Sequence, residues 1–295
     1  MRNFGFLFLI ILLNGCSNDA VDENELSNQN SVLAFGFTEE DETVTGYIDD
    51  LTSTILIEYS DDTDLENLAV EITISENATI ASGLDDMIDL SSEDFIVTVV
   101  AENGDERDYR ISGYTKNLLS NPLGFNTGES WIFNGNGNTV GVDETDDGRN
   151  EFYVIKYEDG VSTDIQQTVI FNRDYSNKYI LFIGDLTTEH VVEGSITRHP
   201  YFWGHQNGPF NFDNDPFEEV IQGDMRHQAG ANVWEIVYDA NILLDGVESV
   251  LFQMGQAGQV GDSWDGTKCK FRDIEVRVFE TFEDSEVYVS NLYML

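Results

Sequence analysis

The chain has few residues that could cross-link it or attract nucleic acid. Its 295 residues include 2 cysteines, 4 prolines, 4 histidines and 14 lysines and arginines. Against these stand 56 aspartates and glutamates, which give a formal net charge of −42. A field of this sign repels phosphate backbones, so it excludes nucleic-acid binding. It also makes anionic polysaccharides poor ligands unless a metal ion bridges them.

The first sixteen residues predict how the chain reaches a membrane. One arginine and an apolar run over 4–13 lead to Leu13-Asn14-Gly15-Cys16. The run is too short to span a bilayer but suits the apolar part of a signal peptide. The pattern resembles a bacterial lipoprotein signal, so we expect a signal peptide over 1–15 and lipidation at Cys16. The polar residues over 16–30 predict a flexible acidic tether. The expected location is the outer membrane, lipid-anchored and exposed at the cell surface.

With Cys16 lipidated, Cys269 has no partner for an intrachain disulfide. Cys269 lies in an alternating run beside Phe271, which predicts a small buried side chain rather than a nucleophile. Stability must then come from apolar cores, and the length after the tether favours two domains.

Short alternating runs broken by turn-forming residues predict an all-β fold. Asn103-Gly104 predicts a hairpin with a type I′ turn. Alternation of Val287 and Val289 predicts one further edge strand at the C-terminus, and no helical pattern of ten residues is visible. Further strands are expected over 151–157, 165–171, 178–183 and 233–238.

The first domain, residues 31–115, resembles the immunoglobulin-like (PKD-like) modules found near the anchor of Bacteroidetes surface lipoproteins. The resemblance is carried by Thr63 to Leu68, Asp94-Phe95, Val97 to Gly104 and Tyr109-Arg110-Ile111. It implies an immunoglobulin-like sandwich that acts as a spacer.

The second domain, residues 117–295, is similar to galactose-binding-like jelly rolls, the fold of many carbohydrate-binding modules. The similarity lies in the opening Asn117 to Trp131, in Val247 to Gly255, and in the closing Phe271 to Val276. Many members carry structural calcium, which implies Asn126 and Asp273 as candidate ligands. The sequence departs from the family at two positions near this site. Asn126 stands where the family usually has Glu, and Arg272 stands where it usually has Asp.

Sugar recognition needs flat aromatic faces and short polar groups. The segment 198–215 supplies both, which makes Tyr201, Trp203, His205 and Asn207 candidate ligand residues. The alternative is a packed loop around Phe210 and Phe212. Trp264, in a loop with Asp262 and Asp265, is a further candidate, and the two carboxylates could instead bind a cation. Trp131 and Trp234 are expected in the core.

The sequence favours a non-catalytic surface lipoprotein that binds polysaccharide or oligosaccharide for a glycan-utilisation system. By analogy, its partners would be a TonB-dependent transporter and that transporter's companion lipoprotein. One alternative is a carbohydrate-active lyase or hydrolase that uses His199, His205 and an acid. The other is a structural or adhesive lipoprotein without a sugar site. No H-E-x-x-H, G-x-S-x-G or phosphate-loop motif is present.

Overall fold

A computed structural model describes residues 26–39, 42–82, 84, 87–91, 95–135, 137–145, 149–155, 163–190, 200–206, 232–256 and 267–293. The chain is mostly β-sheet, which confirms the predicted all-β class. The strands are β1 (Val32–Glu39), β2 (Glu42–Thr45), β3 (Tyr47–Asp49), β4 (Thr54–Tyr59), β5 (Val70–Ile74), β6 (Thr79–Ser82), β7 (Phe95–Val100), β8 (Glu106–Thr115), β9 (Ile132–Asn134), β10 (Thr139–Asp143), β11 (Glu151–Ile155), β12 (Asp164–Ile170), β13 (Tyr179–His190), β14 (Pro200–Gln206), β15 (Glu235–Ile242), β16 (Ser249–Gln256) and β17 (Thr267–Phe279). The helical segments are α1 (Phe125–Gly128) and α2 (Phe282–Tyr293).

The N-terminal lobe is a sandwich of two sheets. Strands β2-β1-β5 form one sheet, and β6, β7, β8, β4 and β3 form the other, in which β4 and β8 run parallel. Alternate residues of both sheets point inward, so Phe35 and Phe37 of β1 pack against Ile57 of β4 and Tyr109 of β8. These side chains are almost fully buried and form a core of their own.

The hairpin at Asn103-Gly104 is present, but its turn differs from the predicted type I′. Gly104 has a φ of 91°, whereas Asn103 is not among the positive-φ residues. The amide of Gly104 donates to the carbonyl of Ala101 (2.9 Å), which closes a turn around Glu102 and Asn103. A single left-handed glycine after such a turn is the three-residue hairpin geometry with a bulge.

The C-terminal lobe is a second sandwich with a larger core. Five strands, β10-β11-β17-β13-β15, face the four-stranded sheet β14-β16-β12-β9. Phe182, Phe202 and Phe252 meet between the sheets, with ring centroids 5.4 to 5.7 Å apart along this set. Cys269 is fully buried in the same core, as predicted for a small apolar side chain.

The C-terminal segment is a helix, so the predicted edge strand over 287–293 is wrong. Thr281 caps α2, because its hydroxyl accepts a hydrogen bond from the amide of Asp284 (3.2 Å) and donates to the carboxylate of Asp284 (2.8 Å). Asp284, Ser285, Tyr288 and Val289 are buried, which is a helical spacing. The signal that could have shown it is Thr281-x-x-Asp284, a capping-box pattern. Neither helical segment in the described ranges has the length and hydropathy needed to cross a bilayer.

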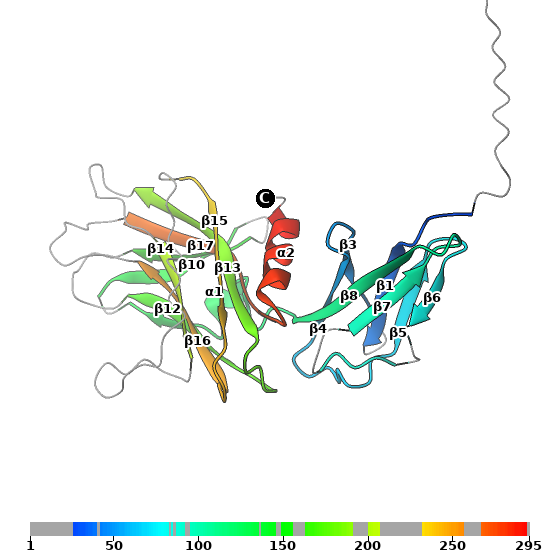
Figure 1. The fold of residues 1–295 in the computed structure, drawn as a ribbon. Coiled ribbons are helices and arrows are strands. Elements are labelled where there is room, and N and C mark those ends of the chain that lie inside the picture. The colour runs from blue at the N-terminus through cyan, green and yellow to red at the C-terminus, as the bar shows by residue number, and fades with distance from the viewer. Residues whose placement is uncertain are drawn as a thin grey trace, which may run out of the picture.

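Helix α2 lies between the two lobes (Figure 1). It packs Tyr288 and Val289 against Leu181 and Ile183 of β13 and against Leu56 of β4. One pair, Phe279 of β17 with Tyr114 of β8, joins the large sheets of both lobes, and the two rings stack at 5.1 Å. The lobes are thus connected through shared packing as well as through the chain.

Candidate functional site

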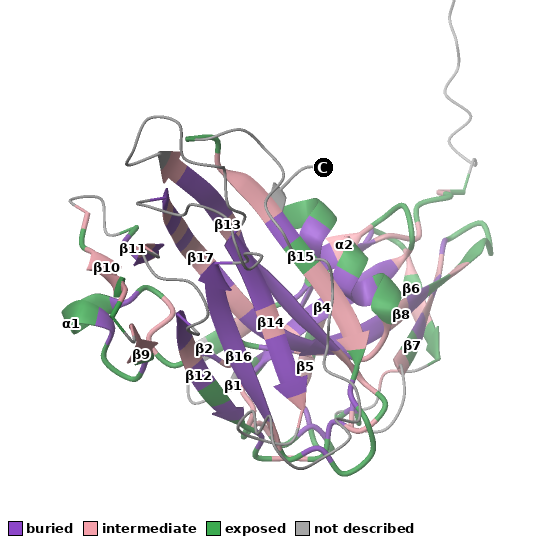
Figure 2. Cartoon of the chain, turned by 90° about the vertical axis from the view of Figure 1, so that its left-hand side faces the viewer, coloured by how far each residue is buried: buried purple, intermediate pink, exposed green. Residues whose placement is uncertain are grey.

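Strand β14 brings three of the predicted ligand residues to one face of the four-stranded sheet. Phe202 points into the core, and because side chains alternate along a strand, Tyr201, Trp203 and His205 point away from it. The Tyr201 and Trp203 ring centroids are 4.7 Å apart, and those of Trp203 and His205 are 5.9 Å apart in an edge-on arrangement. We call this row of rings the aromatic ladder. Figure 2 shows β14 beside β16, both largely buried.

The residues beside the ladder on the neighbouring strands are mostly polar. In register with Tyr201 lie Gly255 of β16, Asp164 of β12 and Asn134 of β9. In register with Trp203 lie Gln253 of β16, Gln166 of β12 and Ile132 of β9. Neighbouring strands are about 4.8 Å apart. Aromatic rings therefore stand beside amide and carboxylate groups, the combination that binds sugar rings and their hydroxyls.

These cross-strand neighbours of the ladder are not apparent from the sequence alone. Gln253 and Gly255 fall in a stretch that resembles a core strand, and only the register shows that they share the ladder's face. The usable signal was alternation: Phe252 and Met254 face the core, so Gln253 and Gly255 must face outward.

Burial differs along the ladder. Tyr201 is 8% exposed and His205 is 3% exposed, whereas Trp203 is only partly buried. The Tyr201 ring lies over Gly255, where an added Cβ would come within 2.6 Å of the tyrosine hydroxyl. Trp203 is thus the most exposed ring of the ladder, and it packs against the ring of Tyr201.

Burial also decides the charge of the ladder. Desolvation lowers the pKa of His205, and a hydrogen bond with Gln253 and the charge of Asp164 oppose that shift. His205 is therefore a neutral imidazole near neutral pH, with one donor and one acceptor nitrogen. Desolvation raises the pKa of the Tyr201 hydroxyl, so it stays protonated and can donate.

Other predicted residues have different outcomes. Cys16, Asn207 and Trp264 lie outside the described residues, as do His199, Asp262 and Asp265. Trp131 is 7% exposed in the C-terminal core, as predicted. Trp234 is only partly buried and carries the guanidinium of Arg272 on its ring, so its predicted place in the core is wrong. The buried residue of that stretch is Val237, which lies on the other face of β15 from Ile236 and Tyr238.

The two predicted calcium ligands, Asn126 and Asp273, contact other side chains in this structure. The carboxylate of Asp273 contacts the guanidinium of Arg149, and Arg272 lies 3.9 Å away. The Asn126 amide donates to Glu129 at 3.3 Å. In the described ranges, no three or more His, Cys, Asp or Glu side chains gather as a metal site. Calcium needs six or more oxygens, and a calcium site at Asn126 and Asp273 stays a prediction.

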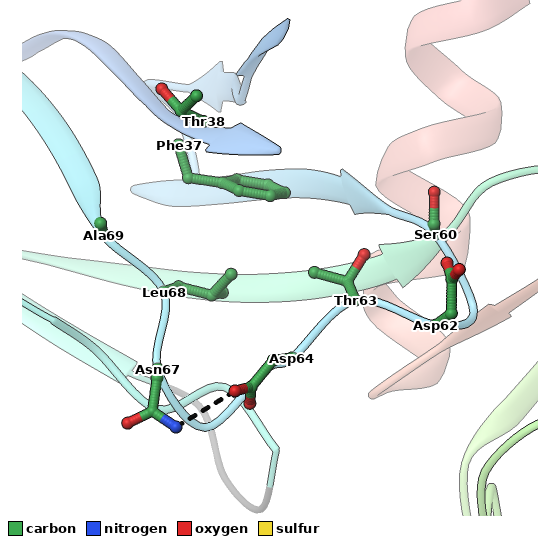
Figure 3. Close-up of a pocket in the computed structure, with 9 residues that line it drawn as sticks. All are labelled: Phe37, Thr38, Ser60, Asp62, Thr63, Asp64, Asn67, Leu68 and Ala69. Carbon is green, nitrogen blue, oxygen red and sulfur yellow. Dashed lines mark hydrogen bonds between the residues drawn. The ribbon is translucent and has the colours of Figure 1, made fainter. Parts of the chain in front are cut away.

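The N-terminal lobe has a hollow of its own, shown in Figure 3. Its only aromatic lining residue, Phe37, is 1% exposed, so it offers no face for stacking. Asn67 donates to Asp64 across its rim at 3.2 Å. The hollow is lined by Phe37, Thr38, Ser60, Asp62, Thr63, Asp64, Asn67, Leu68 and Ala69. This lining is less suited to a sugar than the ladder is.

Comparison with known families matches residues 32–112 to the family model described as SGBP, N-terminal, the N-terminal domain of surface glycan-binding proteins. Comparison with curated proteins gives no match.

Among solved structures, the CBM22-1 xylan-binding domain of Xyn10C from Paenibacillus barcinonensis is 14% identical, with a TM-score of 0.39 over 56% of this chain and 96% of that one. A candidate glycoside hydrolase from Bacteroides thetaiotaomicron is 13% identical, with a TM-score of 0.36 over 86% and 98%. A structure described as family 16 carbohydrate-binding module 2 is 13% identical, with a TM-score of 0.38 over 54% of this chain and 99% of that one. Likenesses of this size carry no argument about the ligand.

Proposed function

We propose that this chain, whose residues 32–112 match the SGBP N-terminal family, is a non-catalytic surface protein that binds glycan. The family match is the observation that carries the proposal, since it links the first lobe to glycan-binding proteins. The C-terminal lobe would supply the chemistry, because the ladder residues Tyr201 and Trp203 stand in register with the carboxylate of Asp164 and the amides of Gln253 and Gln166. Trp203 would stack on a sugar ring, and Gln253 and Gln166 would bind its hydroxyls.

The proposed setting follows from the predicted lipid anchor. Cys16 would hold the protein at the outer membrane, the acidic tether would set it off the surface, and the first lobe would act as a spacer. In a glycan-utilisation system, a TonB-dependent transporter and its companion lipoprotein would take up what the chain captures. A Cys16→Ala variant should then leave the membrane fraction and remain folded.

The rival is a lyase or hydrolase. Tyr201 and His205, on one face with Asp164 nearby, are residue types that serve as acid or base. Native affinity gels with xylan, galactomannan and laminarin test binding, and assays for reducing ends and unsaturated products test cleavage. Retardation without products supports the proposal. Steady product release would support the enzyme, and neither retardation nor products would support a structural protein.

A further inference from the structure

A second surface of the C-terminal lobe concentrates charge and aromatic rings. It lies on the outer face of the five-stranded sheet β10-β11-β17-β13-β15, opposite the ladder. Helix α2 covers one part of this face by packing on Leu181 and Ile183 of β13. The other part carries Lys268, Lys270 and Arg272, which alternate along β17 with the buried Cys269 and Phe271.

Two aromatic rings flank this row of cations. The Tyr153 ring of β11 lies over Gly141 of β10, where an added Cβ would come within 2.8 Å of the tyrosine hydroxyl. The ammonium of Lys268 is 4.3 Å from the centre of that ring. On the other side of β17, the guanidinium of Arg272 is 3.7 Å from the centre of the Trp234 ring. Tyr153 and Trp234 are both only partly buried, so each ring keeps contact with solvent.

The register places the two rings on one line across the strands. Tyr153 pairs with Lys270, Lys270 pairs with Thr187, and the hydroxyl of Thr187 donates to the carbonyl of Val233, next to Trp234. The line from β11 to β15 crosses three strand spacings, about 14 Å. That length suits a short run of sugar units, and it exceeds what a single small ion needs.

The charges on this surface are paired. Lys270 lies 2.9 Å from Glu151 and 3.2 Å from Glu189, and Arg272 lies 3.3 Å from Asp185. Lys268 pairs with Asp143, and Arg149 pairs with Asp185 and Asp273. Five carboxylates thus face four cations, and the surface has no excess of positive charge. An anionic ligand gains little here, whereas side-by-side donors and acceptors match the hydroxyls of an uncharged sugar.

We propose that this surface, formed around Tyr153, Trp234, Lys268, Lys270 and Arg272, is a second binding site for an uncharged sugar chain. The inference rests on glycan binding as the function and adds a site that is independent of the ladder. The two sites lie on opposite faces of one sandwich, so they would engage different stretches of a polysaccharide. Two such contacts raise the overall affinity for a polymer above that for a short oligosaccharide.

The test is calorimetric titration of the full chain with oligosaccharides prepared from whichever of xylan, galactomannan or laminarin it retains in a gel. The wild type should bind two oligosaccharides. The double variant Tyr153→Ala, Trp234→Ala should bind one, and its affinity for the polymer should fall by about tenfold or more. Phe125→Ala, which removes an exposed ring of α1, should change neither value. If the double variant does not melt cooperatively, Lys268→Met with Arg272→Met removes the donors and keeps both rings.

The outcomes separate this inference from the proposed function. A single site that Trp203→Ala abolishes and the double variant leaves intact would overturn the second site alone. A single site that only the double variant abolishes would support this surface and refute the ladder. Binding of polygalacturonate that high salt removes would refute an uncharged ligand. If the wild type retains none of the polymers, both the second site and the proposed function are wrong.

Discussion

At the scale of single residues, the ladder separates binding from stability. Trp203 keeps part of its ring in solvent, so Trp203→Ala should weaken glycan binding by about 1 to 3 kcal/mol, with little change in melting temperature. Tyr201 is 8% exposed and fits over Gly255, so Tyr201→Ala should cost about 3 kcal/mol of folding stability. Calorimetric titration and thermal melts of both variants check this division. Equal losses of stability in the two would show that Trp203 is a packing residue.

His205 predicts a pH dependence. Because burial lowers its pKa in the folded state, the unfolded chain binds a proton more readily below about pH 6.5. The contribution of His205 to stability should therefore be complete at higher pH and decrease as the pH falls from about 6.5 towards the folded pKa. Urea denaturation of the wild type and of His205→Gln between about pH 7.5 and 5 measures the difference. The variant should lose less stability on acidification, and identical pH profiles would contradict the prediction.

The sequence allowed the ladder to be predicted in part. An aromatic and histidine-rich segment was visible, and its alternation would have placed Tyr201, Trp203 and His205 on one face. Their polar neighbours, Gln253 and Asp164, come from strands far apart in the chain, so only the register shows them. The same holds for Trp234, which was expected in the core and instead packs against Arg272.

At the scale of elements, α2 depends on its cap. The hydroxyl of Thr281 accepts a hydrogen bond from the amide of Asp284 and donates one to the Asp284 carboxylate. The first of these bonds satisfies an amide of the first turn that has no partner within the helix. Thr281→Ala should cost about 1 kcal/mol of folding stability. Ser290→Ala, on the exposed side of α2, should cost less than about 0.5 kcal/mol. Chemical denaturation measures both, and equal effects would rule out the cap.

The strands were predictable and α2 was not, for a physical reason. Strands show alternation over four to six residues, and Phe95, Val97 and Val99 or Ile165 and Val169 display it clearly. In α2 the buried positions include Asp284 and Ser285, so polar residues occupy part of the stripe that faces the protein. Because Val287 and Val289 alternate with polar residues, this part of α2 has the sequence pattern of a strand. The partners of Asp284, which are Arg110 and Ser112 on the other lobe and Thr281 at the start of the helix, explain why a carboxylate can be buried there.

At the scale of the whole molecule, ion pairs between the two lobes connect them, and one of these pairs includes a fully buried carboxylate. Asp284 is fully buried and lies 2.5 Å from Arg110 of β8, with the hydroxyl of Ser112 donating to it at 2.7 Å. Arg277 of β17 likewise pairs with Glu58 of β4. These contacts predict that the first lobe orients the second.

Arg110→Ala would leave the Asp284 carboxylate buried without its cation, so it should lower the stability of the whole chain by about 3 kcal/mol. The matched change Arg107→Ala, on the same strand, removes a pair with the largely exposed Asp50 and contacts with Ser53 and the Tyr109 ring, but it leaves no carboxylate buried without a cation, so it should cost less than Arg110→Ala. Urea denaturation followed by tryptophan fluorescence compares them. If Arg110→Ala has no larger effect than Arg107→Ala, the lobes are not coupled through this pair. If the lobes are not coupled in this way, we expect the isolated segment 117–295 to fold alone, because it has a core of its own. Its larger core should make it the more stable of the two lobes.

We propose that the chain binds glycan and leaves it intact. Calorimetric titration of residues 26–295 with a neutral oligosaccharide, followed by mass spectrometry of the recovered sugar, tests it most directly. We predict a saturable heat of binding that depends only weakly on salt, because the ligand is uncharged, and a recovered sugar of unchanged mass. A continuing heat with shortened or unsaturated sugars, or no heat with any neutral glycan, would contradict the account.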